Sequence, residues 1–147
     1  MSLCLEKVHY TIDRKRLLKD VNIRCEAGEL SAIVGPNGAG KSTALKLMSG
    51  DLAPTSGNTI LNRAEVSSYS ARELALRRAV MPQQTSPAFG LKVWEMVQLG
   101  RAPFSENHAL TLEYVEKSLR TVDALHLADR ELMTLSGGEK QRILLAK

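Results

Sequence analysis

The sequence predicts an α/β fold, and three observations support that prediction. A continuous apolar run, Leu30–Val34, is typical of a strand that is covered on both faces. The glycine-rich stretch "GPNGAG" follows directly, and the ten residues after it, "KSTALKLMSG", have the apolar spacing of a helix. A strand, a glycine loop and a helix in this order form the basic unit of sheets that are covered by helices.

Two strands are expected before this unit. The stretches "LCLEKVHYTI" and "LLKDVNIRCE" flank the basic turn "DRKR". In the second stretch Val21, Ile23 and Cys25 alternate with polar residues, which is the period-two pattern of a half-buried strand. An antiparallel β part is therefore expected at the N-terminus.

The expected helix begins at Lys41 and ends at Gly50, with Leu45 and Met48 on its apolar face. After the loop "DLAPTSG", the run "NTIL" predicts a short strand. Ser70 and Glu73 have the spacing of a capping box, so a helix should start there. The run "AVMP" (79–82) predicts another short buried strand.

From Gln83 onward the sequence becomes helical in character. "VWEMVQLG" and the long amphipathic "ENHALTLEYVEKSLRTVDAL" predict helices. We therefore expect a β subdomain with the glycine-loop core over residues 1–83 and a helical insertion over 84–135. The start of another helix is expected over 136–147.

Composition excludes several classes of protein. The 44% apolar and 24% charged residues are typical of a globular domain, and no apolar run is long enough to span a bilayer. The net charge of +4 is spread among interleaved acids, and few aromatic side chains are available for base stacking, so nucleic acid is not an expected partner. Cys4 and Cys25 fit no disulfide or metal framework and are expected to be reduced thiols. An N-terminus without a signal peptide predicts a cytosolic chain.

The stretch "GPNGAGKST" fits the pattern G-x-x-x-x-G-K-[ST], with Gly35, Gly40, Lys41 and Ser42 at the fixed positions. Glycines allow successive backbone N–H groups to converge on a phosphate, and the following helix directs its positive dipole end to the same anion. The lysine can reach the β- and γ-phosphates, and the serine hydroxyl can bind Mg²⁺. The loop therefore predicts a nucleoside triphosphate site with Mg²⁺, without identifying the base.

A second motif separates the phosphate-loop families. The chain contains no N-K-x-D run of a guanine site, but it contains "LSGGEKQR" (Leu135–Arg142), in which Ser136 caps a helix. Together with "GPNGAGKST", this motif makes the chain resemble the nucleotide-binding subunits of ABC transporters, from about residue 3 to the last residue. The resemblance implies a P-loop NTPase fold of the ABC type with an N-terminal antiparallel β subdomain and a helical insertion. It also implies ATPase activity with ATP and Mg²⁺.

The resemblance also implies roles for individual residues. Tyr10 lies where these ATPases place an aromatic that stacks on adenine. Gln83 corresponds to a glutamine that contacts Mg²⁺ and the attacking water, with Gln84 as the alternative. Lys41 and Gln83 would then serve catalysis, and Ser42 and Gln83 the metal. The nucleotide would also contact the remaining loop residues, which are Gly35, Pro36, Asn37, Gly38, Ala39, Gly40 and Thr43. In a head-to-tail homodimer, the signature turn of the second subunit would contact the same nucleotide through Ser136, Gly137 and Gly138.

The same resemblance suggests partners and cargo. "VWEMVQLGRAPF" is similar to a stretch in the ATPases of iron-chelate, hemin and vitamin B12 importers, and "LGRAPF" is most similar to the hemin group. Lys92 departs from that pattern, because threonine is frequent at its position. The implied partners are transmembrane permease subunits and, indirectly, a periplasmic binding protein, at the cytoplasmic side of the inner membrane. A soluble ABC ATPase that acts on nucleic acid is the alternative.

Two catalytic elements of this family have no counterpart in the sequence. The Asp–Glu pair on a strand after the signature helix and the later switch histidine cannot be assigned, so the ABC domain is expected to be incomplete at its C-terminus. Whether this chain hydrolyses ATP by itself is left open. A module that binds nucleotide without turnover is the second alternative.

Overall fold

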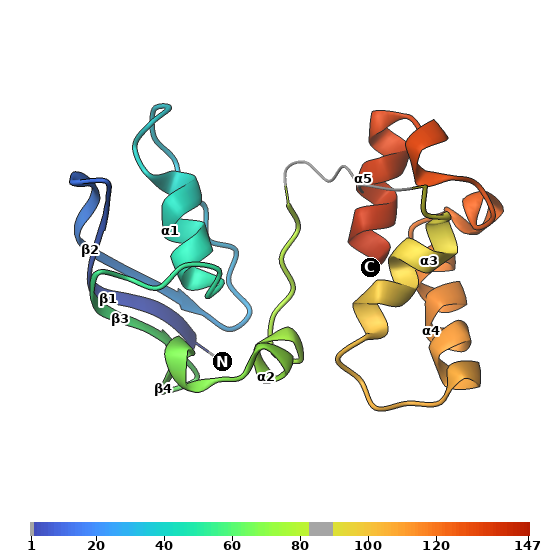
Figure 1. Cartoon of the computed structure of the whole chain (residues 1–147), viewed down its shortest axis with the longest axis horizontal. Helices are drawn as coiled ribbons and strands as arrows, with labels where there is room; N and C mark the ends of the chain where they lie inside the picture. Colours follow the sequence, from blue (N-terminus) through green and yellow to red (C-terminus); the bar gives the residue numbers. More distant parts are fainter. Residues whose placement is uncertain (1, 83–89) are drawn as a thin grey trace. The chain divides into compact units, whose positions relative to one another are not determined.

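The computed structural model describes residues 2–82 and 90–147 and divides into two compact units, Met1–Arg78 and Ala79–Lys147 (Figure 1). Each unit buries apolar side chains of its own. The division falls a few residues before position 83, where the sequence changes character. The two units are described separately.

The first unit contains a four-stranded sheet in the order β2-β1-β3-β4, with every neighbouring pair antiparallel. The strands are β1 (Ser2–Ile12), β2 (Lys15–Glu26), β3 (Ser56–Leu61) and β4 (Ala64–Glu65). The expected N-terminal antiparallel strands and the short strand at "NTIL" are therefore confirmed. Val21, Ile23 and Cys25 are half-buried, as their alternation predicts.

Two tight turns join the strands of this sheet. Asp13 and Arg14 connect β1 to β2 with φ of 48° and 63°, and Asn62 and Arg63 connect β3 to β4 with φ of 52° and 70°. Two consecutive residues with positive φ give a turn whose twist matches that of the strands it joins. The first two residues of the basic turn, Asp13 and Arg14, therefore form the tight turn that lets β1 and β2 pair as a hairpin.

Helix α1 (Lys41–Met48) packs on one face of the sheet and confirms the expected helix (Figure 1). The prediction that Leu45 lies on the apolar face of this helix is wrong, since this leucine is 56% exposed. Leu47 is fully buried instead. The buried stripe of α1 is formed by Ala44, Leu47 and Met48, which are spaced i, i+3 and i+4, and Leu45 lies beside this stripe. The core between α1 and the sheet consists of Leu5, Val8, Leu18, Ala44, Leu47 and Met48.

Two expected strands are absent from the structure. The run Leu30–Val34 has no regular secondary structure, and its Leu30 side chain is fully exposed. Residues 79–82 are also irregular, with Val80 and Met81 each about half exposed. A strand forms only when another strand accepts its hydrogen bonds, and within residues 2–82 and 90–147 neither run pairs with a neighbour. The prediction of two buried strands is therefore wrong for this structure.

The capping box at Ser70 is confirmed at the start of α2 (Ala71–Ala75). Ser70 accepts from the Glu73 backbone N–H, and the Glu73 carboxylate accepts from the Ser70 N–H at 2.8 Å. The hydrogen bonds from Ser70 hold the pKa of Glu73 below its usual value. A short 3₁₀ turn, η1 (Val66–Ser68), precedes α2. Around these elements a small separate core forms from Leu61, Val66 and Leu74.

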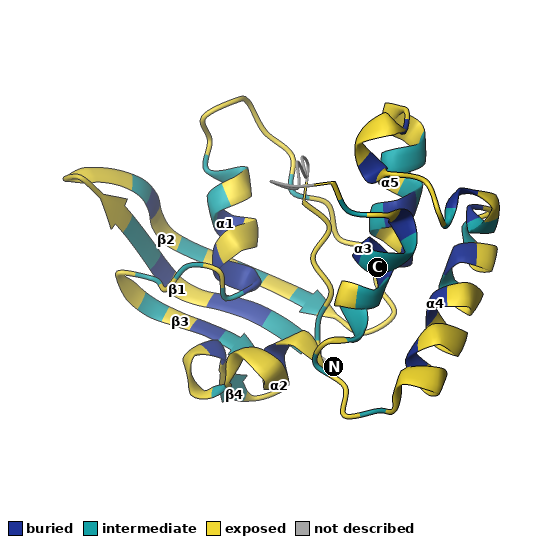
Figure 2. Ribbon diagram, turned by 45° about the vertical axis from the view of Figure 1, so that its right-hand side comes forward, coloured by how far each residue is buried: buried dark blue, intermediate teal, exposed yellow. Residues whose placement is uncertain are grey.

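Within residues 90–147 the second unit contains three α-helices, α3 (Val93–Gln98), α4 (His108–Thr121) and α5 (Gly137–Ala146). Both helices expected between residues 93 and 125 are confirmed, although α4 is shorter than its amphipathic stretch. Short 3₁₀ turns, η2 (Leu99–Arg101), η3 (Leu125–Leu127) and η4 (Leu132–Thr134), join the helices. Figure 2 shows the buried stripes on the helices, which contribute Val93, Met96, Val97, Val115, Leu119, Ile143 and Ala146.

The first turn of α3 is anchored to the segment before η4. The Val93 N–H donates to the Arg130 carbonyl at 3.0 Å, and the Leu132 N–H donates to the Leu91 carbonyl at 2.8 Å. Lys92 is the N-cap residue, and its backbone N–H donates to the Glu95 carboxylate at 2.7 Å. Lys92 therefore makes one of the two hydrogen bonds of a capping box, the one in which the N-cap residue donates through its backbone N–H and needs no hydroxyl side chain.

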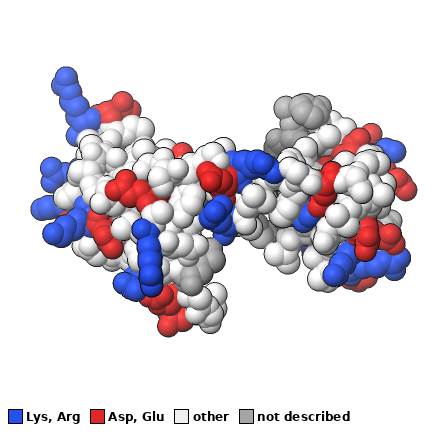
Figure 3. Space-filling model, turned by 90° about the horizontal axis from the view of Figure 1, so that it is seen from below, with Lys and Arg blue, Asp and Glu red and all other residues white. Residues whose placement is uncertain are grey.

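The surface carries mixed charge, as expected from the interleaved sequence. In Figure 3 lysines and arginines lie among aspartates and glutamates on the face in view. Cys4 pairs with Arg24 and Cys25 with Leu3, so the two cysteines occupy opposite faces of the sheet, and both are free thiols. Among the helices of the described part of the chain, none combines the length and the apolar character that crossing a membrane requires.

Candidate functional site

The loop between residues 35 and 40 has the backbone that its glycines predict. Gly38 and Gly40 have φ of 83° and 89°, in the left-handed region that favours glycine. A Cβ built on Gly40 would lie 2.6 Å from Leu18 Cδ2 and 3.2 Å from the Leu17 carbonyl oxygen. Gly40 thus allows the loop to touch β2 closely before the chain enters α1. The first amides of α1 have no acceptor within the helix and are available to an anion at the loop.

Lys41 closes the loop on itself. Its ammonium donates to the carbonyl oxygens of Gly35 and Pro36, both at 2.7 Å. An ammonium carries three donors, so one remains free, and the two carbonyls are acceptors that a phosphate oxygen can replace. The side chain is therefore held over the loop, where the sequence motif requires it.

The two hydroxyl residues after Lys41 differ in exposure. Ser42 is exposed and Thr43 half-buried, and the Ser42 hydroxyl has no hydrogen-bond partner among the residues that the structure describes. Within those residues, no cluster of three or more His, Cys, Asp or Glu side chains is arranged to hold a metal. The exposed Ser42 hydroxyl is an oxygen ligand of the kind that Mg²⁺ takes, and Mg²⁺ keeps few protein ligands.

Tyr10 lies in the same unit as the loop. It is half-buried on β1 at the edge of the core under α1, and it faces Leu18 across the β1–β2 pair. Leu18 is also the side chain that lies closest to Gly40. Leu18 thus pairs with Tyr10 in the sheet and also lies beside Gly40 of the loop. Gln83 and its alternative Gln84 lie outside the described residues.

Ser136 caps α5, as expected from the motif "LSGGEKQR". Its hydroxyl accepts weakly from the Glu139 backbone N–H, at 3.4 Å, and donates to the Glu139 carboxylate at 2.6 Å. Gly137 and Gly138 occupy the first turn, and a Cβ built on either would meet no heavy atom within 4 Å. The turn therefore presents its backbone to open space.

Glu139 is a residue of this turn to which the sequence analysis assigned no role. Its carboxylate accepts from both the N–H and the hydroxyl of Ser136, and these hydrogen bonds hold the pKa of Glu139 below its usual value. Arg130 and Arg142 lower it further through their charge. The S-x-x-E spacing was a sufficient signal, since the same spacing identified Ser70 and Glu73.

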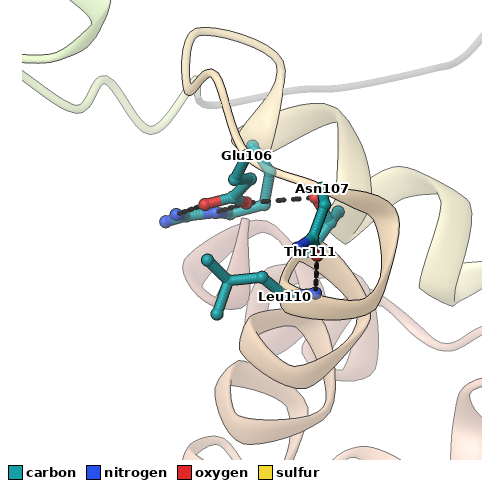
Figure 4. A network of polar contacts seen from close by, with 5 residues as sticks. Glu106, Asn107, Leu110 and Thr111 are labelled. Carbon is teal, nitrogen blue, oxygen red and sulfur yellow. Dashed lines mark hydrogen bonds and ion pairs between the residues drawn. The ribbon is translucent and has the colours of Figure 1, made fainter.

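The segment "LGRAPF" folds around the guanidinium of Arg101. Arg101 donates to both carboxylate oxygens of Glu106, at 2.8 and 2.6 Å, and Glu106 also accepts from the Thr111 hydroxyl at 3.1 Å (Figure 4). The rings of Phe104 and Tyr114 lie 3.8 and 4.2 Å from the guanidinium carbon. This group, the Arg101 cluster, fixes the loop between η2 and α4.

Comparison with known families identifies the chain. The family described as "ABC transporter" matches residues 18–147, which is most of the sequence. The chain belongs to the ABC transporter family. The prediction made from the glycine loop and the signature motif is confirmed, as is the ABC-type fold with an antiparallel sheet and a helical part.

Curated relatives within the ABC transporter family carry a more specific name. The hemin import ATP-binding protein HmuV of Rhodopseudomonas palustris (strain BisA53) is 44% identical over 97% of the chain and 52% of that protein. The protein of the same name from Bradyrhizobium diazoefficiens is 43% identical over the whole chain and 55% of its own length. The chain spans about half the length of the curated relatives it matches.

Solved ABC structures have the same fold. The chain matches cbiO1 from Clostridium perfringens, part of an ABC transporter complex, with a TM-score of 0.80 and 28% identity. That match covers 98% of the chain and 59% of cbiO1. An ATP-binding cassette of an ABC transporter in its ADP conformation matches with a TM-score of 0.79 and 26% identity, over 99% of the chain and 63% of that protein.

Proposed function

We propose that the chain is the ATP-binding, energy-coupling part of an ABC importer, which uses ATP hydrolysis to drive transport across the inner membrane. The observation that supports this most strongly is the glycine loop, whose left-handed glycines and inward-held Lys41 form a cradle for phosphate. The signature turn in the same chain supports the ABC class specifically. Family membership supports ATPase activity for the whole protein.

In this proposal each residue of the loop has a defined task. The backbone N–H groups from Gly35 to Thr43 surround the phosphates, and Lys41 exchanges its two carbonyl acceptors for phosphate oxygens. The exposed Ser42 hydroxyl and Gln83 bind Mg²⁺, which neutralises phosphate charge when it is present. Tyr10 offers its ring to adenine. Lys41 and Gln83 are the residues of this chain that serve catalysis.

The proposed assembly is a head-to-tail homodimer. Ser136, Gly137 and Gly138 of one subunit close over the phosphates held by the loop of the other, because this exposed helix start offers backbone donors to an anion. Closure acts on transmembrane permease subunits at the cytoplasmic side of the inner membrane. A periplasmic binding protein delivers the cargo to those subunits and does not contact the ATPase.

Hemin or an iron chelate is the proposed cargo. The names of the curated relatives and the segment "LGRAPF", which contributes Arg101 and Phe104 to the Arg101 cluster, support this choice. Co-purification of the chain with hemin-importer permease subunits, compared with permease subunits of an unrelated importer, tests it. Equal recovery with both permeases, or salt-sensitive binding to RNA in place of permease binding, would contradict the assignment.

Nucleotide binding is tested by titrating the chain with Mg-ATP and comparing Lys41→Ala with Lys46→Ala. Both lysines lie on α1, but only Lys41 donates to the loop. We expect Lys41→Ala to weaken ATP binding at least tenfold, about the value of one charge-assisted contact, and Lys46→Ala to leave it unchanged. Equal effects would refute the loop as the site. Mg-ATPase turnover measured on the same variants separates an active ATPase from a module that only binds nucleotide.

A further inference from the structure

The Ser136 hydroxyl is already committed to a carboxylate of its own chain. Ser136 Oγ donates to Glu139 Oε2 at 2.6 Å, and the Ser136 backbone N–H donates to the same oxygen at 2.8 Å. A serine hydroxyl carries one proton and can donate one full hydrogen bond at a time. While this contact exists, Ser136 Oγ has no proton to offer to another anion.

Charge strengthens this contact. The Ser136 donors lower the pKa of the Glu139 carboxyl, and Arg130 and Arg142 add to the effect, so Glu139 is ionised at neutral pH. The carboxylate also lies in the first turn of α5, where the helix dipole favours negative charge. A phosphate that approaches Ser136 therefore competes with an anion that is already in place, and it is repelled by that anion.

The rest of the turn is accessible. Gly137 and Gly138 have no heavy atom within 4 Å of the position where a Cβ would stand. Both residues are exposed, and as glycines they carry no side chain that would cover the backbone of this turn. Among the donors of this turn, the two on Ser136 are the ones that Glu139 occupies.

We infer that Glu139 is a positioning residue that holds the Ser136 hydroxyl in a resting contact, and that this contact must break before Ser136 donates to a γ-phosphate held by a second copy of the chain. This inference rests on the proposed function, since it assigns a regulatory step to the same composite site. Glu139 thereby sets the ATP concentration at which the signature turn engages.

The chain contains a matched control for this contact. Ser70 and Glu73 form the same capping box at α2, with the Glu73 carboxylate accepting from both the N–H and the hydroxyl of Ser70 at 2.8 Å. Glu73→Gln makes the same chemical change as Glu139→Gln at a helix outside the two motifs. Glutamine is also accepted at this position of a capping box, so neither helix start is lost.

The experiment follows the backbone amide resonances of Ser136, Gly137 and Gly138 in the ¹⁵N-labelled full chain during titration with Mg-ATP. Glu139→Gln should lower the ATP concentration at half-saturation of these shifts by about threefold to tenfold, because a neutral amide holds the Ser136 donors less strongly than a carboxylate does and does not repel phosphate. Glu73→Gln should leave it unchanged. In a Ser136→Ala background, Glu139→Gln should not lower the half-saturation concentration, because the hydroxyl for which Glu139 and phosphate compete is gone.

The resting contact is measured separately, without nucleotide, by titrating the Glu139 carboxyl with ¹³C NMR. Ser136→Ala should raise its pKa towards the ordinary value of 4.5. An unchanged pKa, an unchanged half-saturation in Glu139→Gln, or the absence of any ATP-dependent shift at Ser136–Gly138 would each overturn the inference. If Ser136–Gly138 show no ATP-dependent shift but Gly35–Thr43 do, ATP still binds at the loop and only this inference fails. If neither segment shifts, the proposed function fails as well.

Discussion

Among single residues, Gly40 combines two requirements that no other residue type meets. Its φ of 89° lies in the left-handed region, and a Cβ added to it would meet both the Leu18 side chain and the Leu17 carbonyl oxygen. The first requirement concerns backbone strain and the second concerns space. Gly28 has a similar φ of 80° but open space around it. The pair therefore allows the two costs to be measured separately.

We expect Gly28→Ala to lower the free energy of unfolding by about 1 kcal/mol, the cost of a non-glycine residue in this region. Gly40→Ala should cost more, about 2–4 kcal/mol, because the added methyl group also displaces Leu18. It should weaken ATP binding as well, since the loop must shift away from β2. Urea denaturation and Mg-ATP titration of both variants measure these effects. Equal losses in the two variants would show that contact with Leu18 is unimportant.

At the scale of elements, the helix starts show which structural features a sequence can predict. The capping box at Ser70 and the cap at Ser136 depend on residues within one turn, and both are present in the structure. The β1–β2 hairpin likewise depends on a local turn and an alternating pattern. The runs Leu30–Val34 and 79–82 were predicted wrongly, because an apolar run becomes a strand only when a distant partner supplies hydrogen bonds.

The Arg101 cluster shows a different limit of sequence reasoning. The segment "LGRAPF" was noticed for its similarity to hemin importers, but nothing local predicts that Arg101 is enclosed by Glu106, Phe104 and Tyr114. Glu106 lies five residues away, and Tyr114 belongs to the following helix. For the site, the loop and signature residues could be predicted from their motifs. The contact between Ser136 and Glu139 could also have been predicted, because Glu139 stands three residues after the N-cap serine, as in a capping box.

The start of α4 should depend on pH through Glu106. Hydrogen bonds from Arg101 hold the pKa of this carboxyl below its usual 4.5, and Thr111 adds to the effect. A carboxyl with a lowered folded-state pKa stabilises the fold fully above its unfolded value and loses that contribution as pH falls through the folded value. Glu106→Gln should therefore be less stable than the wild type at pH 6, and the difference should shrink as pH falls below 4.5.

Thermal unfolding followed by circular dichroism at pH 6, 4.5 and 3 measures this difference. Glu116→Gln is the control, because it removes an exposed ion pair with Arg120 on the same helix. Such surface pairs contribute about 0.2–1 kcal/mol, so this variant should lie close to the wild type throughout. A constant difference between Glu106→Gln and the wild type from pH 6 to pH 3 would contradict the role assigned to the Arg101–Glu106 pair.

At the scale of the whole molecule, the buried core of each unit coexists with apolar side chains that lie in solvent. Leu47 and Leu119 are buried in the first and second unit, while Leu30 is fully exposed and Val34 is 86% exposed. Burial contributes stability only for side chains that leave water on folding. Leu30 and Val34 therefore add little to the stability of this structure, whereas Ile33 of the same run is partly buried against the core under α1.

We expect Leu30→Ser to change the free energy of unfolding by less than about 0.5 kcal/mol, the usual range for surface substitutions. Leu47→Ala should cost roughly 2–5 kcal/mol, because it leaves a cavity beneath α1. Leu30→Ser should also reduce binding of a hydrophobic dye and slow aggregation at high protein concentration. Denaturant unfolding and dye fluorescence of the two variants make the comparison. A large loss of stability in Leu30→Ser would mean that Leu30–Val34 is packed in solution and that the strand expected from its sequence does form.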